Sequence, residues 1–206
     1  MSRKKGSRIH LLLILVVIAV LIWSLIKPEE GYRVWLLECS PSVIILIIFI
    51  SRYNKFRFTT LSYVIISLLV ILTFIGGHYS YAKVPLFNWL KDYFDLERNH
   101  YDRFGHFLKG LMLIVILEIL LRKTTLVKSK TTQFIALCIT LSIGAFYEII
   151  EWLSTKIAKG GKVTENFLGM QGDIWDAQWD MSLLLVGSIL SLLLFTKLLY
   201  RGLAKT

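Results

Sequence analysis

Six of the 14 acidic residues of this chain fall in three short phrases that also hold two of its four histidines. The phrases are NHYDRFGHF (99–107), GAFYEIIEW (144–152) and GMQGDIWDAQWDM (169–181), and each abuts a long apolar run. Ionisable side chains at the edge of a bilayer are costly to insert, so they usually mark a functional site. We therefore expect the chemistry of the chain to be concentrated in these phrases.

Helical spacing brings the polar residues of each phrase onto one face. Asp102 and His106 are four residues apart, so they stack one turn above the other. The other two phrases repeat the spacing of three or four residues with the acids Glu148, Glu151, Asp173, Asp176 and Asp180. His78, at the end of the third apolar run, lies at the same level. Four helix ends are thus predicted to direct carboxylates and imidazoles to one layer near the outer headgroups.

Carboxylates held this close together repel, so some of them must share a proton or a cation. Carboxylate oxygens combined with imidazole nitrogens suit divalent ions such as Mg²⁺, Mn²⁺, Ca²⁺ or Zn²⁺. We expect a divalent metal, and the candidate ligands are His78, His106, Glu148, Glu151, Asp173, Asp176 and Asp180.

A metal at the headgroup level would polarise a phosphoryl or carbonyl oxygen and activate water. The candidate catalytic residues are His106, Asp102, Glu148, Asp176 and Asp180, with Asp102 orienting His106 by a hydrogen bond. In the alternative without a metal, one protonated acid serves as general acid beside a neighbouring base.

Structural roles compete with these assignments. Asp102 and Asp173 are each also expected as helix caps, and Asp102 as a partner of Arg98 or Arg103. His106 is also interpretable as a packing histidine. Glu148 is harder to explain structurally, since it lies one turn deeper than Glu151 and has no base at helical spacing.

The elements that position these residues are apolar helices. The chain is 55% hydrophobic with a mean hydropathy of +0.63, which is too apolar for an ordinary soluble domain. Six runs approach the length of a membrane span: 9–26, 34–50, 59–76, 104–121, 132–151 and 181–200. The prediction is an all-α polytopic membrane protein with about six transmembrane helices.

We expect residues 1–206 to form a single integral membrane domain. Residues 1–76 hold three apolar anchoring spans, and residues 77–206 hold the site-bearing spans and two outer segments, 77–103 and 152–180. The run 9–26 follows a basic N-terminus like that of a signal peptide, but it exceeds the usual apolar length. A retained first span is therefore predicted, with a cleaved signal as the alternative.

The basic residues predict the orientation. Of the 24 lysines and arginines, 14 lie in segments on the side of the membrane that holds the N-terminus and nine lie on the opposite side. Lys109 lies within the fourth run. By the positive-inside rule both termini are cytoplasmic. The basic residues behind the net charge of +10 then lie beside anionic headgroups, so membrane lipid is the expected partner and nucleic acid is not.

The three phrases resemble the YjdF family of bacterial inner-membrane proteins. The resemblance runs from about His78 to Phe195, and the phrase QGDIWDAQWDM is its most specific part. The chain is similar, more distantly, to VanZ-like proteins, which carry an Asp-x-x-x-His at one helix start and a Glu near the end of a later one. The resemblance implies a multi-pass protein of the bacterial cytoplasmic membrane, and it supplies no reaction. The residues that it implies are shared are His78, Asp102, His106, Glu148, Glu151, Gln171, Asp173, Asp176, Gln178 and Asp180.

Two functions remain open from the sequence. The first is a metal-dependent enzyme that acts on an envelope lipid or lipid-linked intermediate at the outer leaflet. The second is a non-enzymatic ligand-binding or shielding protein, or a small permease. Below Lys109 the fourth run carries only Glu118 as a further acid, and a one-sided site fits this better than a transport path.

Overall fold

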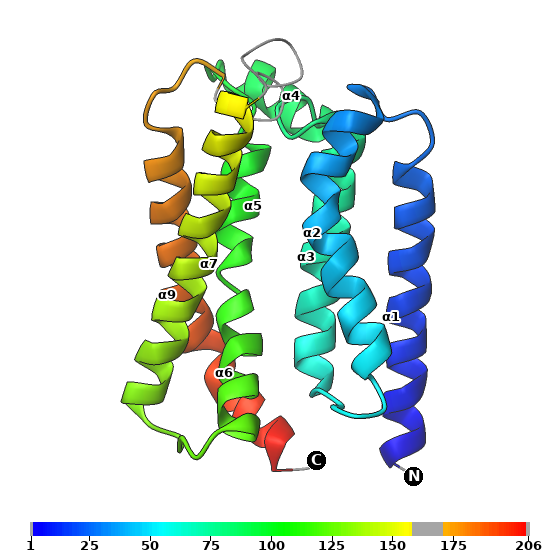
Figure 1. Cartoon of the computed structure of the whole chain (residues 1–206), viewed down its shortest axis with the longest axis vertical. Helices are drawn as coiled ribbons and strands as arrows, with labels where there is room; N and C mark the ends of the chain where they lie inside the picture. Colours follow the sequence, from blue (N-terminus) through cyan, green and yellow to red (C-terminus); the bar gives the residue numbers. More distant parts are fainter. Residues whose placement is uncertain (1, 158–170, 205–206) are drawn as a thin grey trace.

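The computed structural model describes residues 2–157 and 171–204, and in these ranges every regular element is a helix. The prediction of an all-α protein is confirmed. The helices are α1 (Ser2–Ser24), α2 (Gly31–Arg52), α3 (Thr60–Tyr79), α4 (Pro85–Tyr93), α5 (Tyr101–Lys109), α6 (Met112–Lys123), α7 (Lys130–Ile157) and α9 (Asp176–Leu203). All except the short α4 run up and down one bundle (Figure 1).

Five helical stretches are long and apolar enough to cross a membrane: Gly31–Arg52, Thr60–Tyr79, Tyr101–Lys123, Lys130–Ser154 and Asp176–Leu203. The third of them combines α5 and α6. The apolar part of α1, Arg8–Ser24, is shorter, but α1 packs along α3 and runs parallel to the other helices (Figure 1). The chain is therefore a polytopic membrane protein whose predicted first span lies in the bundle.

Two of these helices begin earlier than the apolar runs do. The sequence predicted spans from residues 104 and 181, whereas α5 begins at Tyr101 and α9 at Asp176. Near a bilayer the backbone N–H and C=O groups are best satisfied within a helix, so helices continue past the apolar residues. As a result Asp102, Asp176 and Asp180 lie within regular helix, on its first turns.

The bundle has two halves with separate cores. Helices α1, α2 and α3 pack around Val17, Cys39 and Phe74. Helices α6, α7 and α9 pack on a second core that includes Leu117 and Leu199, and α3 joins the two halves. Whether the first half serves only as an anchor stays a prediction.

The α5–α6 span is broken where it crosses α9. The Gly110 and Leu111 amides donate to carbonyls three residues earlier, so the helix tightens there. A Cβ on Gly110 would overlap the backbone of Gly187 and Ser188, and a Cβ on Gly187 would overlap the Phe107 carbonyl. The two glycines let the helices touch backbone to backbone, which is a common way for transmembrane helices to associate in lipid.

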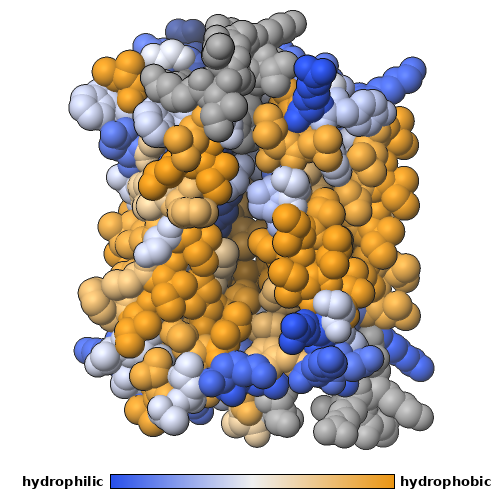
Figure 2. All heavy atoms as spheres, in the orientation of Figure 1, coloured by the Kyte–Doolittle hydropathy of each residue, from blue (hydrophilic) through white to orange (hydrophobic). Residues whose placement is uncertain are grey.

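Both chain ends lie at the same end of the bundle (Figure 1), together with the connections 53–59 and 124–129. Figure 2 shows an apolar band between two hydrophilic rims, as a membrane protein requires. We call the end opposite the termini the outer end; its extracytoplasmic location stays a prediction. Of the basic residues counted there, Lys159 and Lys162 and the side chain of Lys156 lie outside the described residues.

A buried acid joins two helices at the inner end of the bundle, where the termini lie. Glu118 of α6 is fully buried and accepts hydrogen bonds from the Thr59 amide at 2.8 Å and the Ser62 hydroxyl at 2.6 Å. Arg122 donates to it from one turn below at 2.9 Å. This satisfied network ties α6 to the start of α3, so Glu118 has a structural role.

Candidate functional site

The acids at the outer end separate into two groups. The first is the arginine–aspartate cluster, which consists of Arg98, Arg103, Asp173 and Asp176. Arg98 Nη1 lies 2.5 Å from Asp176 Oδ1, and Arg103 forms an ion pair with Asp173. Cross-pairs of 3.9 Å and 3.7 Å link each arginine to the other aspartate. Two positive charges thus balance two negative ones where α9 begins.

A glutamine docks the segment before α9 onto the segment before α5. The Gln171 side chain accepts from the Asn99 amide and donates to the Asn99 carbonyl, both at 2.9 Å. Gln171 and Gly172 have φ values of +48° and +89°, which turn the chain back toward α9. This docking brings the phrases 99–107 and 169–181 together.

Asp173 has a local structural role as well. Its Oδ1 accepts from the Trp175 amide at 2.8 Å, in a turn directly before α9. This hydrogen bond, followed by the Arg103 guanidinium, lowers the pKa of Asp173 below its ordinary value. The N-cap residue of α9 is Trp175, without a side-chain cap hydrogen bond, so Asp173 is not the helix cap that the sequence suggested and instead holds the turn before it.

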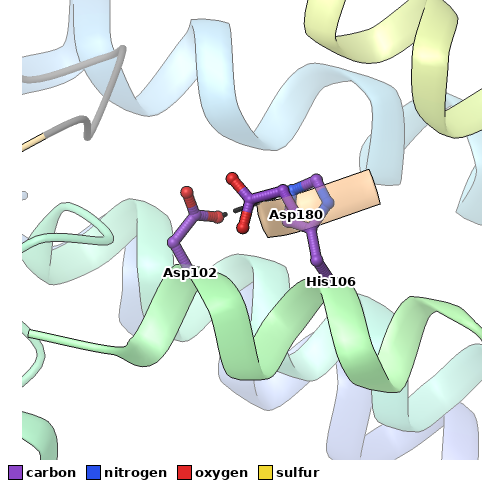
Figure 3. Close-up of side chains that lie close together, drawn as sticks. All are labelled: Asp102, His106 and Asp180. Carbon is purple, nitrogen blue, oxygen red and sulfur yellow. Dashed lines mark ion pairs between the residues drawn. The ribbon is translucent and has the colours of Figure 1, made fainter. Parts of the chain in front are cut away.

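The second group is the His106 cluster, which consists of Asp102, His106, Glu148 and Asp180 with Lys109. Asp102 and His106 rise from α5, and the Asp180 carboxylate reaches between them from α9 (Figure 3). One ligand atom of each of these three residues lies within 4.8 Å of the other two. The predicted convergence of phrases 99–107 and 169–181 is present in the structure.

His106 is the centre of this cluster. Its Nε2 lies 3.6 Å from Asp102 Oδ1, 3.5 Å from Glu148 Oε1 and 2.8 Å from Lys109 Nζ. The Lys109 ammonium also lies 4.7 Å from the centroid of the Tyr147 ring. Lys109 therefore already places one positive charge among the acids.

Several atoms of the His106 cluster lack hydrogen bonds. His106 is 1% exposed, yet its Nδ1 has no partner among the residues that the structure describes. In the same described part of the chain, Glu148 Oε1 and Asp180 Oδ1 also lack one. Buried polar atoms are normally satisfied, so unpaired ones at one point indicate room for a ligand, ion or water.

These donors fit a divalent ion. Ligand atoms on opposite sides of an octahedral Mg²⁺ are about 4.2 Å apart, and those around Ca²⁺ are up to about 5 Å apart. A spread of 4.8 Å for Asp102, His106 and Asp180 is near these values, so small side-chain rotations would suffice. An ion bound by His106 Nε2 would have to displace Lys109.

The structure brings some of the predicted metal ligands together and holds others apart. Asp173, just before α9, and Asp176, its first residue, contact arginines, so of these three aspartates Asp180 is the one that reaches His106. Glu151 lies one turn beyond Glu148, within electrostatic range of the cluster.

His78 is placed elsewhere in the bundle. It packs against Trp23 with 4.2 Å between ring centroids, and its Nδ1 lies 3.3 Å from the Ser24 carbonyl. The structure therefore places His78 beside α1, and its contacts there are not with the His106 cluster.

A groove leads to the His106 cluster from the side of the bundle. A cavity of about 300 Å³ lies between the two halves, and Figure 2 shows the surface hollowed there. Apolar side chains of α2, α3, α6 and α7 line most of it, among them Phe49, Met112 and Ile143. Its polar lining includes His106, Lys109 and Glu38.

Four contributors were not among the site residues proposed from the sequence. Arg98 and Arg103 were considered only as partners of Asp102, and Lys109 and Glu38 were given no role. Arg98 and Arg103 flank the phrase NHYD, which was a usable signal. Glu38 had no such local signal, because its neighbours in the groove come from other helices.

Comparison with known proteins decides the family. The family described as "Predicted membrane protein (DUF2238)" matches residues 9–201. The chain belongs to this family. It is 35% identical over 179 residues to the "Inner membrane protein YjdF" of Escherichia coli (strain K12), covering 86% of this chain and 84% of the relative. No solved structure matches.

The predicted resemblance to the YjdF family is thereby confirmed, whereas the likeness to VanZ-like proteins stays a prediction. The family match, the inner-membrane relative and the five apolar helices establish a multi-pass protein of the bacterial cytoplasmic membrane.

Proposed function

We propose that this protein is a metal-dependent enzyme that acts on an envelope lipid or lipid-linked intermediate at the outer leaflet. The observation that carries the proposal is the groove: apolar side chains of the membrane spans form most of its lining, and its polar lining includes His106 and Lys109 of the His106 cluster. An amphiphile entering from the bilayer would keep its chain in the apolar part and present its headgroup to His106. Sites of this kind are concave, mostly apolar and contain a few convergent polar groups.

In this proposal the residues of the two clusters have separate roles. Asp102, His106 and Asp180 would hold a divalent ion, which supplies Lewis-acid polarisation of a phosphoryl or carbonyl oxygen. Glu148 would accept a proton from water, since its unpaired Oε1 points to the same place. The arginine–aspartate cluster would hold the start of α9, and with it Asp180, in position.

A binding protein without chemistry is the second candidate. It is favoured by Lys109, whose ammonium lies 2.8 Å from His106 Nε2 and compensates the nearby acids without an ion. A permease has less support, because Glu118 on the inner side is occupied by Thr59, Ser62 and Arg122.

Elemental analysis of the detergent-purified chain distinguishes the candidates. The enzyme proposal expects about one divalent ion per chain, lost in Asp180→Asn and retained in the matched control Asp92→Asn, the same change at an exposed residue of α4. Incubation with total envelope lipids, followed by mass spectrometry, should then show a product that disappears with Glu148→Gln. Retention of lipid without metal or product would instead support the binding protein.

A further inference from the structure

Glu38 is an acid that the proposed chemistry does not use. It lies on α2, is 3% exposed, and lines the groove on the wall opposite His106. Neither carboxylate oxygen has a hydrogen bond of good geometry within the described chain, although the Tyr81 amide faces the group. A carboxyl group is seldom buried in this way unless a partner of another kind completes it.

The surrounding chain makes room for this carboxyl. Gly77 of α3 faces α2, and a Cβ there would overlap Cys39 Sγ and lie 3.5 Å from Glu38 Oε2. The preceding Gly76 is covered by the Tyr81 ring, which also lies near Gly105 of α5. The glycine pair thus admits Glu38 on one side and Tyr81 on the other, at the polar part of the groove.

The two walls of the groove present different polar groups. Glu38 supplies acceptors from α2, and Lys109 supplies an ammonium from α5. A headgroup that spans these walls needs hydrogen-bond donors at one end and an anion at the other.

We infer that the groove selects an amphiphile with a zwitterionic, amine-bearing headgroup of the phosphoethanolamine type. Its ammonium donates to Glu38, its phosphate accepts from Lys109, and a hydrocarbon chain occupies the apolar lining below. This inference rests on the proposal that the groove holds a lipid, and it names which lipid class. A phosphoglycerol headgroup would leave the Glu38 carboxyl without a cationic partner.

Native mass spectrometry of the full chain in detergent tests the inference. Phosphatidylethanolamine should bind about tenfold tighter than phosphatidylglycerol of the same chains, since one hydrogen bond between charged groups corresponds to roughly that factor. Glu38→Gln should remove this preference. Glu29→Gln, the same change at an exposed residue before α2, should leave it intact.

A second measurement needs no variant. Stepwise N-methylation of the headgroup to phosphatidylcholine removes the donors while keeping the charge, so the native chain should lose affinity with each methyl group. Equal binding of phosphatidylethanolamine, its two partly methylated forms and phosphatidylcholine would overturn the headgroup inference and leave the lipid groove standing. If no lipid copurifies with the chain and none binds when it is added back, both proposals are overturned.

Discussion

Two guanidinium groups determine which acids of the outer end remain available for a ligand. Arg98 and Arg103 contact Asp173 and Asp176, and these carboxylates are already satisfied. Asp180, one turn further along α9, lies beyond their reach and meets His106 instead. Asp173 and Asp176 therefore have a structural role, whereas Asp180 keeps one oxygen without a hydrogen bond among the described residues.

Removing Arg98 should be strongly destabilising. Its partner Asp176 is 4% exposed, and breaking a buried pair leaves an uncompensated charge that costs about 3–5 kcal/mol. We expect Arg98→Met to lower the melting temperature markedly in detergent. Arg98→Met combined with Asp176→Asn should recover part of the loss, because no unpaired charge remains. A single variant as stable as the native chain would contradict this assignment.

Asp173 should make stability depend on acid pH. Its pKa is lowered in the folded chain by the Trp175 amide and by Arg103, so ionised Asp173 favours folding. The contribution is fully present above the unfolded pKa of about 3.9 and is lost as pH falls through the lower folded value. Melting curves from pH 6 to pH 3 should show a steeper loss for the native chain than for Asp173→Asn. Parallel curves would show that Asp173 does not contribute.

The contact between α5 and α9 depends on the absence of two side chains. At Gly110 the helix tightens, and the Ser191 hydroxyl donates to the Gly110 carbonyl at 3.2 Å. Gly187 meets the Phe107 carbonyl directly. This crossing fixes how far Asp180 extends toward Asp102 and His106.

Gly187→Ala should therefore be destabilising although alanine is the better helix former. The new Cβ would overlap the Phe107 carbonyl oxygen, so the helices must separate. Gly105→Ala is the matched control: its Cβ would lie 3.9 Å from Tyr81, an ordinary contact, and it should gain about 0.5–1 kcal/mol from helix propensity. Melting temperatures of the two variants should move in opposite directions. A rise for Gly187→Ala would show that the crossing can adjust.

Part of this site could be predicted from the sequence, and the reasons for the remainder are physical. Spacing of three or four residues fixes a helix face, so Asp102 above His106 followed directly. Which helix faces which is decided by packing at Gly110 and Gly187, and spacing within one helix carries no information on that. His78 shows the limit, because its level was predicted while its direction toward Trp23 was not.

The molecule as a whole consists of two apolar halves, and the arginine–aspartate cluster and the His106 cluster lie at its outer end. Both termini and the connections 53–59 and 124–129 share the opposite end (Figure 1). The half formed by α1, α2 and α3 contributes Glu38 to the lining of the groove, so both halves line it as well as packing on each other through α3.

Cysteine labelling in intact cells should confirm the orientation. With Cys39 and Cys138 replaced by alanine, a cysteine at Glu97 should react with a membrane-impermeant maleimide, and one at Lys128 should react only after lysis. The expectation follows from the excess of basic residues at the end that holds the termini. The reverse pattern would place the His106 cluster in the cytoplasm.

The arginine–aspartate cluster also has a consequence for biosynthesis. Arg98 enters the membrane edge with the α5 span, but its partner Asp176 is made 78 residues later, with the last helix. A nascent chain stopped before α9 would carry Arg98 without Asp176, and Asp102 and His106 without Asp180. Only translation of the final helix completes the pairing, so truncated products should be recognised and degraded as unassembled.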